Sequence, residues 1–401
     1  YTEYATSLNE KFFDHWASGL SPEISKLPFV TDAVDRLVWE SSLKRAVIIV
    51  DAFRLDCAYE LEAQMPGGDC KVTALRAALP TRTPVGMCAL LPKELQPQDL
   101  SIKDDELYPM REGKSLADRQ NRLSALESYG AQLLSIEDAV AANTAPEKAG
   151  KLLVVYGHET LDSMGHGNDG ALISYMEDEV RQLLRVVKKL HSWGYPQVHI
   201  ITDHGFVLFP PEWLPREVPF TKDWTILQKE RFGITQRSTD VPLIRKSCPW
   251  NEEFLVAVPP GLAFFKTEKS FSHGGATLQE MIIPHFVSSV HTTPKTFEVR
   301  VELESYQLTR AALKIVLGSK TDNTQSEDLF EQPSRKLEIQ ITKKSSGISV
   351  LPNGQAKTVL LSWNDKEKGV TAFFDSKHSF FADEQLILSV SDKDTGEKDR
   401  K

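Results

Sequence analysis

The sequence predicts an α/β fold with a parallel-sheet core, followed by an antiparallel β-sandwich domain. Short apolar runs rich in β-branched residues occur at Ala46–Val50, Leu152–Tyr156 and Val198–Thr202, and an amphipathic helical stretch joins the last two. This strand–helix–strand order is typical of a parallel sheet. After Thr292 the hydrophobic pattern changes to a period of two between Gly, Asn and Asp turns, which indicates antiparallel strands.

Composition limits the classes of protein to consider. The 401 residues, 41% hydrophobic and 26% charged, are enough for two or three globular domains. The net charge of -9 gives no general attraction for nucleic acid, so a nucleic-acid substrate would need a local basic patch or metal ions. The four cysteines show no CxxC spacing, which favours a reduced, cytoplasmic setting. No apolar run approaches the roughly eighteen residues needed to span a bilayer, so we expect no membrane association. A signal peptide is not expected either.

The chain divides into segments of different character. Residues 1–45 read as a helical lead-in, interrupted at Gly19, and the α/β domain is expected at residues 46–292. In two stretches the strand and helix patterns no longer alternate, and we interpret both as insertions. They are residues 93–150 and residues 206–270. The β-sandwich domain is expected at residues 295–401. Because the sequence does not begin with Met, we expect it to be a fragment or a processed chain.

An Asp–His pair, Asp203 and His204, stands at the end of the run Val198–Thr202. A carboxylate and an imidazole in this position cannot both be buried unpaired, because burying an ionised carboxylate costs several kcal/mol, to order of magnitude, unless a cation or hydrogen bonds offset it. The pair is therefore either a set of metal ligands or an ordinary polar end to a strand. Other residues decide between the two.

Similar side chains follow the other predicted strands. Asp51 ends the first strand, and the predicted loop after Leu152–Tyr156 carries Asp162 and His166. The carboxyl ends of parallel strands lie at one edge of a sheet, so these residues are expected to meet there. A later histidine supplies one more ligand. The complete candidate set is Asp51, Asp162, His166, Asp203, His204 and His273.

Six oxygen and nitrogen ligands without a thiolate suit zinc, manganese or magnesium. They exceed what one catalytic ion needs, so two divalent ions are predicted. Two ions close together are suited to phosphoryl transfer, because they can stabilise both the attacking and the leaving oxygen.

The segment TRTPVGM offers a protein nucleophile. Thr83 precedes a proline and an apolar helical run, which predicts that it is a helix N-cap whose hydroxyl lies near the helix amides. Thr81 is the alternative nucleophile. Arg54 and Arg82 are candidates for binding substrate oxygens, although an arginine near strand ends is often only structural.

The order of these residues resembles that of the alkaline phosphatase superfamily. The resemblance implies an alkaline-phosphatase-like core with helices on both faces of the sheet. It also implies one metal site made of Asp162, His166 and His273, and a second made of Asp51, Asp203, His204 and the Thr83 oxygen, which acts as nucleophile or metal bridge.

Within that superfamily, the chain resembles the PglZ family over about residues 46–290. The segments that carry this resemblance are VDAFRLD, LPTRTPVGMCALLP, TDHGF and FSHGGATLQEMIIPHF. PglZ proteins are components of bacterial phage-defence systems of the BREX and phage-growth-limitation kind. The resemblance implies a metal-dependent hydrolase of phosphate esters or diesters that acts beside other defence proteins.

Three functions remain open. The first is a two-metal phosphodiesterase or nuclease acting on nucleic acid or a nucleotide, which we favour. The second is a phosphomonoesterase or phosphomutase acting on a small substrate; a sulfatase is disfavoured because Thr83 cannot be converted to formylglycine. The third is a scaffold of a defence complex with a structural metal site.

Overall fold

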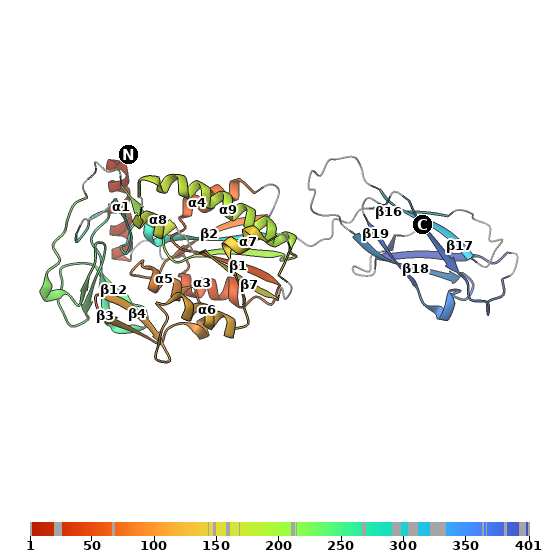
Figure 1. Cartoon of the computed structure of the whole chain (residues 1–401), viewed down its shortest axis with the longest axis horizontal. Coiled ribbons are helices and arrows are strands. Elements are labelled where there is room, and N and C mark those ends of the chain that lie inside the picture. The colour runs from red at the N-terminus through yellow and green to blue at the C-terminus, as the bar shows by residue number, and fades with distance from the viewer. Residues whose placement is uncertain are drawn as a thin grey trace. The chain divides into compact units, whose positions relative to one another are not determined.

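The protein is described by a computed structural model. It places residues 2–19, 26–65, 69–142, 144–146, 150–157, 161–167, 169–209, 213, 215–266, 270–290, 298–303, 312–320, 334–362, 365, 367–380, 383–392 and 398–399 (Figure 1). The chain forms two compact units, Tyr1–Val290 and His291–Lys401, and each is described by itself. The expected junction at residues 292–295 lies outside the described residues.

The first unit is built on a six-stranded sheet. Four adjacent strands are parallel, and the full order is β2 (Asp69–Arg76), β15 (Ile282–Ser289), β8 (Gln197–Thr202), β1 (Arg45–Val50), β7 (Leu152–Tyr156) and β6 (Gln132–Ser135). The strands expected near residues 46–50, 152–156 and 198–202 are three adjacent members of this parallel group, namely β1, β7 and β8.

The sheet is mixed rather than wholly parallel, which corrects the sequence-based expectation. β15 pairs antiparallel with β8 and with β2. Its chain arrives from the loop that holds His273, through the short helix α10 (Leu278–Met281), at the edge where the parallel strands end. A strand that enters the sheet from that edge has to run in the opposite direction. His273 therefore precedes its strand, whereas Asp51 and Asp203 follow theirs.

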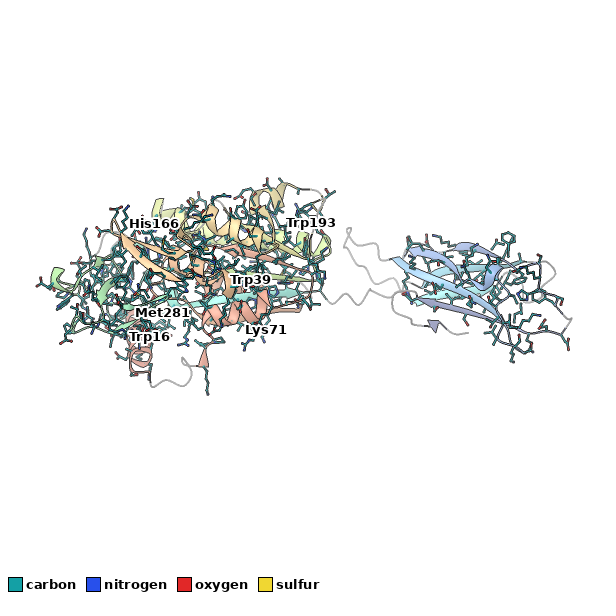
Figure 2. All side chains as sticks on the ribbon, turned by 90° about the horizontal axis from the view of Figure 1, so that it is seen from below. Trp16, Trp39, Lys71, His166, Trp193 and Met281 are labelled. Atoms are coloured by element: carbon teal, nitrogen blue, oxygen red, sulfur yellow. The ribbon has the colours of Figure 1, made fainter. Side chains whose placement is uncertain are left out.

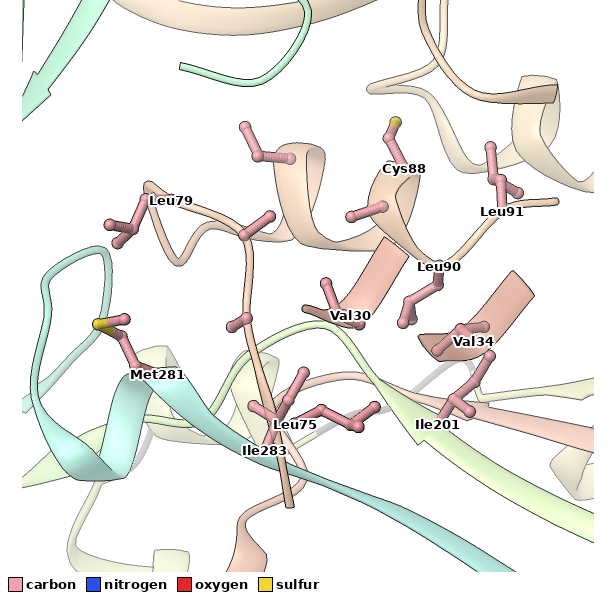
Figure 3. Packing of buried hydrophobic residues seen from close by; sticks show 14 of the residues in the cluster. Val30, Val34, Leu75, Leu79, Cys88, Leu90, Leu91, Ile201, Met281 and Ile283 are labelled. Atoms are coloured by element: carbon pink, nitrogen blue, oxygen red, sulfur yellow. The ribbon is translucent and has the colours of Figure 1, made fainter. Parts of the chain in front are cut away.

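Helices pack on both faces of the sheet (Figure 1). On one face, α4 (Leu55–Ala63), α7 (Ile136–Ala141) and α9 (Leu172–Ser192) share a core with Ile48 and Ile200. On the other face, α3 (Val30–Val34) and α5 (Thr83–Ala89) contribute to a second core, which contains Leu75, Ile201 and Ile283 (Figure 3). Successive residues of one strand point to opposite faces, so Ile200 and Ile201 belong to different cores.

The lead-in contains α1 (Thr2–Ser18), α3 and the π-helical turn η1 (Asp35–Trp39). The indole Nε1 of Trp39 donates to the carbonyl oxygen of Leu90 at 2.8 Å, which ties this region to the end of α5. Trp16 of α1 and Met281 line one cavity of about 450 Å³ and lie near one another in Figure 2. The lead-in is therefore part of the core of the first unit.

Residues 93–150 contain two kinds of structure. The antiparallel strands β3 (Asp99–Lys103), β4 (Glu106–Arg111) and β5 (Lys114–Ser115) form a sheet of their own, followed by α6 (Arg119–Ser128). β6 and α7, in contrast, extend the main sheet and its helical layer. The prediction that the whole of residues 93–150 is an insertion is therefore wrong for β6 and α7, which belong to the core of the domain. β6 has only four residues, so its hydrophobic pattern is too short to indicate a core strand.

Residues 206–270, which were predicted to be an insertion and are called the excursion below, leave and rejoin the domain core at neighbouring positions. Strand β9 (Val207–Leu208) pairs antiparallel with β14 (Phe271–Ser272). Between them lies a four-stranded antiparallel sheet of β10 (Leu227–Gln228), β11 (Gly233–Gln236), β13 (Asn251–Ala257) and β12 (Arg245–Cys248). The β9–β14 pair brings the residues just before the excursion next to those just after it, and thus His204 next to His273.

The second unit contains two antiparallel sheets that share one hydrophobic core. Their orders are β16 (Glu298–Leu303), β17 (Ala312–Lys320), β20 (Lys368–Phe373) and, separately, β19 (Lys357–Ser362), β18 (Ser334–Lys343), β21 (Leu386–Asp392), β22 (Lys398–Asp399). Alternate residues of β18, namely Leu337, Ile339 and Ile341, are fully buried, as the period-two pattern indicates. Across the described part of the chain, no helix combines the length and apolarity needed to cross a bilayer.

Candidate metal centre

Four segments bring their polar side chains to one edge of the main sheet, where the loop that carries His273 joins them. Asp51 follows β1, and Asp203 and His204 follow β8. The helix α8 (Leu161–Gly167) comes after β7 and carries Asp162 and His166, while Thr83 begins α5 beyond the end of β2. Asp162 and His166 were expected in a loop, which is wrong: they lie one helical turn apart, on the same face of α8.

The first ligand group contains Asp51, Asp203, His204 and Thr83. The Nε2 atom of His204 lies 3.3 Å from Asp203 Oδ2, 3.7 Å from Asp51 Oδ1 and 3.2 Å from Thr83 Oγ1. The side chains of Asp203 and His204 are fully buried, and that of Asp51 is 12% exposed. Four potential ligand atoms therefore surround one small, dry region.

The second ligand group contains Asp162, His166 and His273. His273 Nε2 is 3.1 Å from Asp162 Oδ1 and 3.2 Å from His166 Nε2, and His166 Nε2 is 3.6 Å from Asp162 Oδ1. The side chain of His166 is 42% exposed, so this group opens to solvent. Candidate ligand atoms of Asp162, His204 and His273 also lie within 4.8 Å of one another, so the two groups adjoin.

Backbone contacts fix the tautomers of the two buried histidines. The Nδ1 atom of His204 is 2.9 Å from the Gly205 carbonyl oxygen, and that of His273 is 2.9 Å from the Thr81 carbonyl oxygen. A carbonyl oxygen only accepts, so Nδ1 carries the proton in each ring, and Nε2 of the neutral ring presents a lone pair. Both lone pairs point to the carboxylates. Metal-binding histidines are typically oriented in this way, by a hydrogen bond at the ring nitrogen that does not bind the metal.

Three carboxylate oxygens at the centre lack a hydrogen bond. Among the described residues, Asp51 Oδ1, Asp162 Oδ1 and Asp203 Oδ2 have no partner of acceptable geometry, although each is buried. Unpaired buried acceptors are costly, and here they face histidine lone pairs rather than donors. Two adjoining groups of oxygen and nitrogen acceptors, the first buried and the second open to solvent at His166, fit a pair of divalent cations.

The pKa values of the carboxyl groups reflect this crowding. Burial, with the nearby Asp203 and Asp162, raises the pKa of Asp51 well above its ordinary value. Burial also raises the pKa of Asp203 to about 7. Burial, followed by the proximity of His273, lowers the pKa of His204 to about 4, so this ring is neutral at pH 7.

Close packing places Thr83 beside the first group. A Cβ on Gly86 would lie 2.7 Å from the Cβ of Asp203, so only glycine lets α5 approach the end of β8 this closely. Asp203 Oδ1 accepts hydrogen bonds from the Ala52 and His204 amides at 3.1 and 2.9 Å, which fixes its carboxylate. Together these contacts hold Thr83 near His204.

Thr83 is the first residue of α5 rather than its N-cap, which corrects the sequence-based expectation. The amides of Val85 and Gly86 both donate to the carbonyl oxygen of Arg82, so Arg82 occupies the cap position. The Thr83 hydroxyl is consequently not used in a capping bond and turns to His204 Nε2.

Thr81 is engaged differently. Its hydroxyl, which is fully buried, donates to the Gly275 carbonyl oxygen at 2.8 Å and accepts from the Gly274 amide at 3.0 Å. Its own carbonyl oxygen orients His273. These contacts give Thr81 a role in holding the His273 loop and leave Thr83 as the hydroxyl that faces the ligands.

The two candidate arginines lie in different places. Arg82 Nη1 is 3.5 Å from His273 Nε2, and Arg82 lines a cavity of about 520 Å³ together with His166 and His273. Arg54 forms a bidentate pair with Asp56, at 2.7 and 3.0 Å, and lies over the ring of Phe206. It lines a separate cavity of about 270 Å³. The geometry therefore supports Arg82, and not Arg54, at the candidate centre.

Sequence reasoning did not single out several further residues. Lys229, Glu230 and Lys266, from the excursion, line the cavity beside His166 and His273. Arg122 of α6 shares a cavity of about 70 Å³ with Asp51 and donates to two backbone carbonyl oxygens. These residues lie in stretches without a strand–helix rhythm, so the sequence carries no signal that places them at the sheet edge.

Comparison with known proteins identifies the family. The family model described as the BREX system PglZ alkaline phosphatase-like domain matches residues 29–287. The chain is 24% identical over 290 residues to the alkaline phosphatase-like protein PglZ of Bacillus cereus (strain H3081.97), covering 66% of this chain and 33% of that protein. It is 28% identical over 287 residues to the alkaline phosphatase-like protein BrxZ of Escherichia coli O9:H4 (strain HS), covering 64% and 32%.

The chain thus spans about a third of the length of the curated relatives it matches. Among solved structures, an inactive murine ectonucleotide pyrophosphatase/phosphodiesterase in complex with AMP aligns with a TM-score of 0.40 and 12% identity, over 62% of this chain and 88% of that one. The family model covers more than half of the sequence and includes all six candidate metal ligands. The resemblance inferred from the sequence is confirmed, and the chain belongs to the PglZ family of alkaline phosphatase-like domains.

Proposed function

We propose that this chain is a metal-dependent phosphoester hydrolase, most consistent with a phosphodiesterase or nuclease of a phage-defence system. The observation that carries the proposal is the pair of adjoining ligand groups, in which buried carboxylate oxygens without donors face histidine lone pairs. Membership of the PglZ family supports the same reaction class.

In this proposal Asp162, His166 and His273 hold one divalent ion. Asp51, Asp203 and His204 hold the other, with Thr83 beside them. Zinc fits the mixture of imidazole and carboxylate ligands, and manganese and magnesium are the alternatives. Bound divalent ions would supply the positive charge that stabilises phosphoryl oxygens during transfer.

The protein's own groups account for the remaining chemistry. The Thr83 hydroxyl loses its proton and its oxygen attacks phosphorus while the bond from phosphorus to the leaving oxygen breaks and the leaving oxygen takes up a proton. Water then loses a proton and attacks the same phosphorus, the bond from phosphorus to the Thr83 oxygen breaks, and Thr83 regains its hydroxyl. The guanidinium of Arg82, at the cavity wall, pairs with a phosphoryl oxygen. Lys229 and Lys266 also line this cavity, where Lys229 Nζ pairs with Glu106 at 2.7 Å and Glu230 contributes a carboxylate, so Arg82 is the residue proposed to bind the anionic substrate.

The proposed setting follows from the relatives. The description of the matched family names the BREX system, so we propose other proteins of such a defence system as partners, with nucleic acid or a nucleotide as substrate. Cys57, Cys88 and Cys248 are buried thiols outside any disulfide, which supports a cytoplasmic location.

Hydrolysis of two model substrates tests the proposal. The purified chain, supplied with zinc, manganese or magnesium, should release nitrophenol from bis(para-nitrophenyl) phosphate faster than from para-nitrophenyl phosphate. The reverse preference would favour a phosphomonoesterase. Metal binding without hydrolysis of either substrate, or of a nucleic acid, would favour the scaffold.

A further inference from the structure

Arg231 and Glu280 form an ion pair without solvent exposure behind the loop that carries His273. Arg231 Nη2 lies 2.7 Å from Glu280 Oε2, and Arg231 Nε donates to Glu280 Oε1 at 3.2 Å. Removing two charges from water is costly, and the pair repays this cost only if its remaining polar atoms are also satisfied.

The arginine is satisfied by the excursion that precedes the loop. Arg231 Nη1 donates to the Ala263 carbonyl oxygen and Nη2 to that of Gly261, and the guanidinium lies 4.8 Å from the centroid of the Phe264 ring. Arg231 therefore joins the turn between β10 and β11 to residues 261–264.

The glutamate is satisfied by the loop itself. Glu280 Oε1 accepts from the Gly275 amide at 2.8 Å, and Oε2 accepts from the amide and the hydroxyl of Thr277 at 3.1 and 2.7 Å. A Cβ on Gly275 would lie 2.8 Å from Arg231 Nη2, so the guanidinium packs directly against the loop backbone two residues after His273. Thr81 holds the other side of the same loop.

The pair also connects the ligand to the cavity wall. Glu230, which precedes Arg231, accepts from the Ser272 hydroxyl at 2.7 Å, and Ser272 precedes His273. Gln228, Lys229 and Glu230 line the cavity beside His166 and His273. One rigid assembly thus includes the cavity wall and the ligand loop.

We infer that the Arg231–Glu280 pair positions His273 for metal binding, so that a small change in the pair weakens the ion held by Asp162, His166 and His273. The inference rests on the proposed metal centre. Groups that hydrogen-bond a metal ligand directly typically change metal affinity by about 10–100-fold when they are altered, and this pair acts on His273 one step further away, through the Gly275 amide. A purely structural pair would instead lower thermal stability and leave metal affinity unchanged.

Titration calorimetry of the whole chain with zinc, at a temperature well below unfolding, separates these roles. Wild type is compared with Arg231→Lys, which keeps the charge but loses the bidentate fork. The matched control is Arg335→Lys, which makes the same change in another buried pair: Arg335 Nε lies 2.8 Å from Asp392 Oδ2, with exposures of 3% and 4%, in the second unit. Glu280→Gln provides the same comparison if Arg231→Lys does not fold.

We expect wild type and Arg335→Lys to bind two zinc ions alike. Arg231→Lys should bind one ion normally and the other at least about tenfold more weakly. Unchanged affinities in Arg231→Lys, or equal weakening of both ions, would overturn the inference and leave the proposed function standing. A wild-type chain that binds no zinc would overturn both.

Discussion

The imidazole rings of His204 and His273 stack with their centroids 4.3 Å apart and their planes 10° apart. His204 belongs to the first ligand group and His273 to the second, so the two groups share a wall. The stacking follows from the β9–β14 pair, which closes the excursion between them. The two ligand groups therefore adjoin through a direct contact between one histidine of each.

The first prediction concerns metal content. Six convergent ligands should hold two divalent ions per chain, measured by elemental analysis after purification with added metal. Chelation should lower the melting temperature, because a ligand at a hundred times its Kd stabilises the folded state by about 2.7 kcal/mol. Less than one equivalent of metal would contradict the prediction. A single tight ion would indicate that only one group is functional.

The second prediction concerns the nucleophile. Thr83→Ala should reduce phosphodiesterase turnover by about a hundredfold or more, the effect of losing one positioned catalytic group. Thr83→Ser should retain much of the activity, since the oxygen remains. Stability should change little, because the Thr83 hydroxyl makes no capping bond. Near-wild-type turnover in Thr83→Ala would show that another group attacks phosphorus.

Thr81→Ala provides the contrasting case. It removes a buried hydroxyl that pairs with Gly274 and Gly275, so it should lower the free energy of unfolding by about 1–3 kcal/mol. Denaturant unfolding of Thr81→Ala and Thr83→Ala, side by side, checks this order. A larger loss of stability in Thr83→Ala would contradict the assignment of the two hydroxyls.

The third prediction concerns Asp203 in the metal-free chain. Burial raises the pKa of Asp203 to about 7 in the folded state, from 3.8, so the folded chain holds a proton that the unfolded chain releases. This group's contribution to stability is present below pH 3.8 and is lost as pH rises to about 7. Asp203→Asn removes the charge, and its amide can donate to His204 Nε2, 3.3 Å from the replaced oxygen.

Metal-free Asp203→Asn should therefore melt at a higher temperature than metal-free wild type at pH 7, and at a similar temperature near pH 4. With metal the order at pH 7 should reverse, because asparagine is the poorer ligand. Calorimetry with and without chelator tests both statements. If metal-free wild type were instead more stable than metal-free Asp203→Asn at pH 7, the predicted sign of the stability difference would be wrong.

The fourth prediction concerns a histidine pair away from the centre. His199 Nδ1 lies 3.0 Å from His285 Nε2, on neighbouring strands, and both side chains are buried. Burial, with His285 and Arg45 nearby, lowers the pKa of His199 to about 3, and burial with Lys71 nearby lowers that of His285 to about 4. Both rings are neutral in the folded chain at pH 5, whereas the unfolded chain protonates them below about pH 6.5.

Stability should therefore fall as pH decreases from about 6.5 to about 4, with each histidine contributing about 2 kcal/mol by pH 5. His285→Gln should reduce the loss between pH 7 and pH 5 by about that amount. Urea unfolding of both metal-free chains at the two pH values measures the difference. An equal loss in wild type and variant would exclude the pair as the cause.

Much of the centre could be predicted because strand ends carry a strong signal. Asp51 and Asp203 stand directly after buried β-branched runs, and parallel topology requires such ends to meet. Their carboxylates do lie together around His204. The α/β character of the core and the antiparallel character of the last hundred residues were predicted from hydrophobic periodicity, whereas the antiparallel strand β15 in the core sheet was not.

Three further features could not be predicted from the local sequence: the helix α8, the direction of β15 and the pairing of Arg54. Helix α8 is too short to show a hydrophobic period, so Asp162 and His166 were expected in a loop. The direction of β15 depends on where its chain enters the sheet, and its hydrophobic pattern is the same in either direction. Arg54 was predicted to bind substrate oxygens, which stays a prediction; its pairing with Asp56 and its place over the Phe206 ring depend on side-chain packing that the sequence does not indicate.

The late entry of β15 into the sheet bears on how the protein is made. The ligands of the centre extend along the chain from Asp51 to His273, so the centre forms only when a segment of more than two hundred residues has closed, and such long-range contacts form slowly. During synthesis the centre cannot exist until the segment through Glu280 has left the ribosome. Metal capture would then mark the end of folding of the first unit, and an ion bound across these distant segments would oppose unfolding of the unit as a whole.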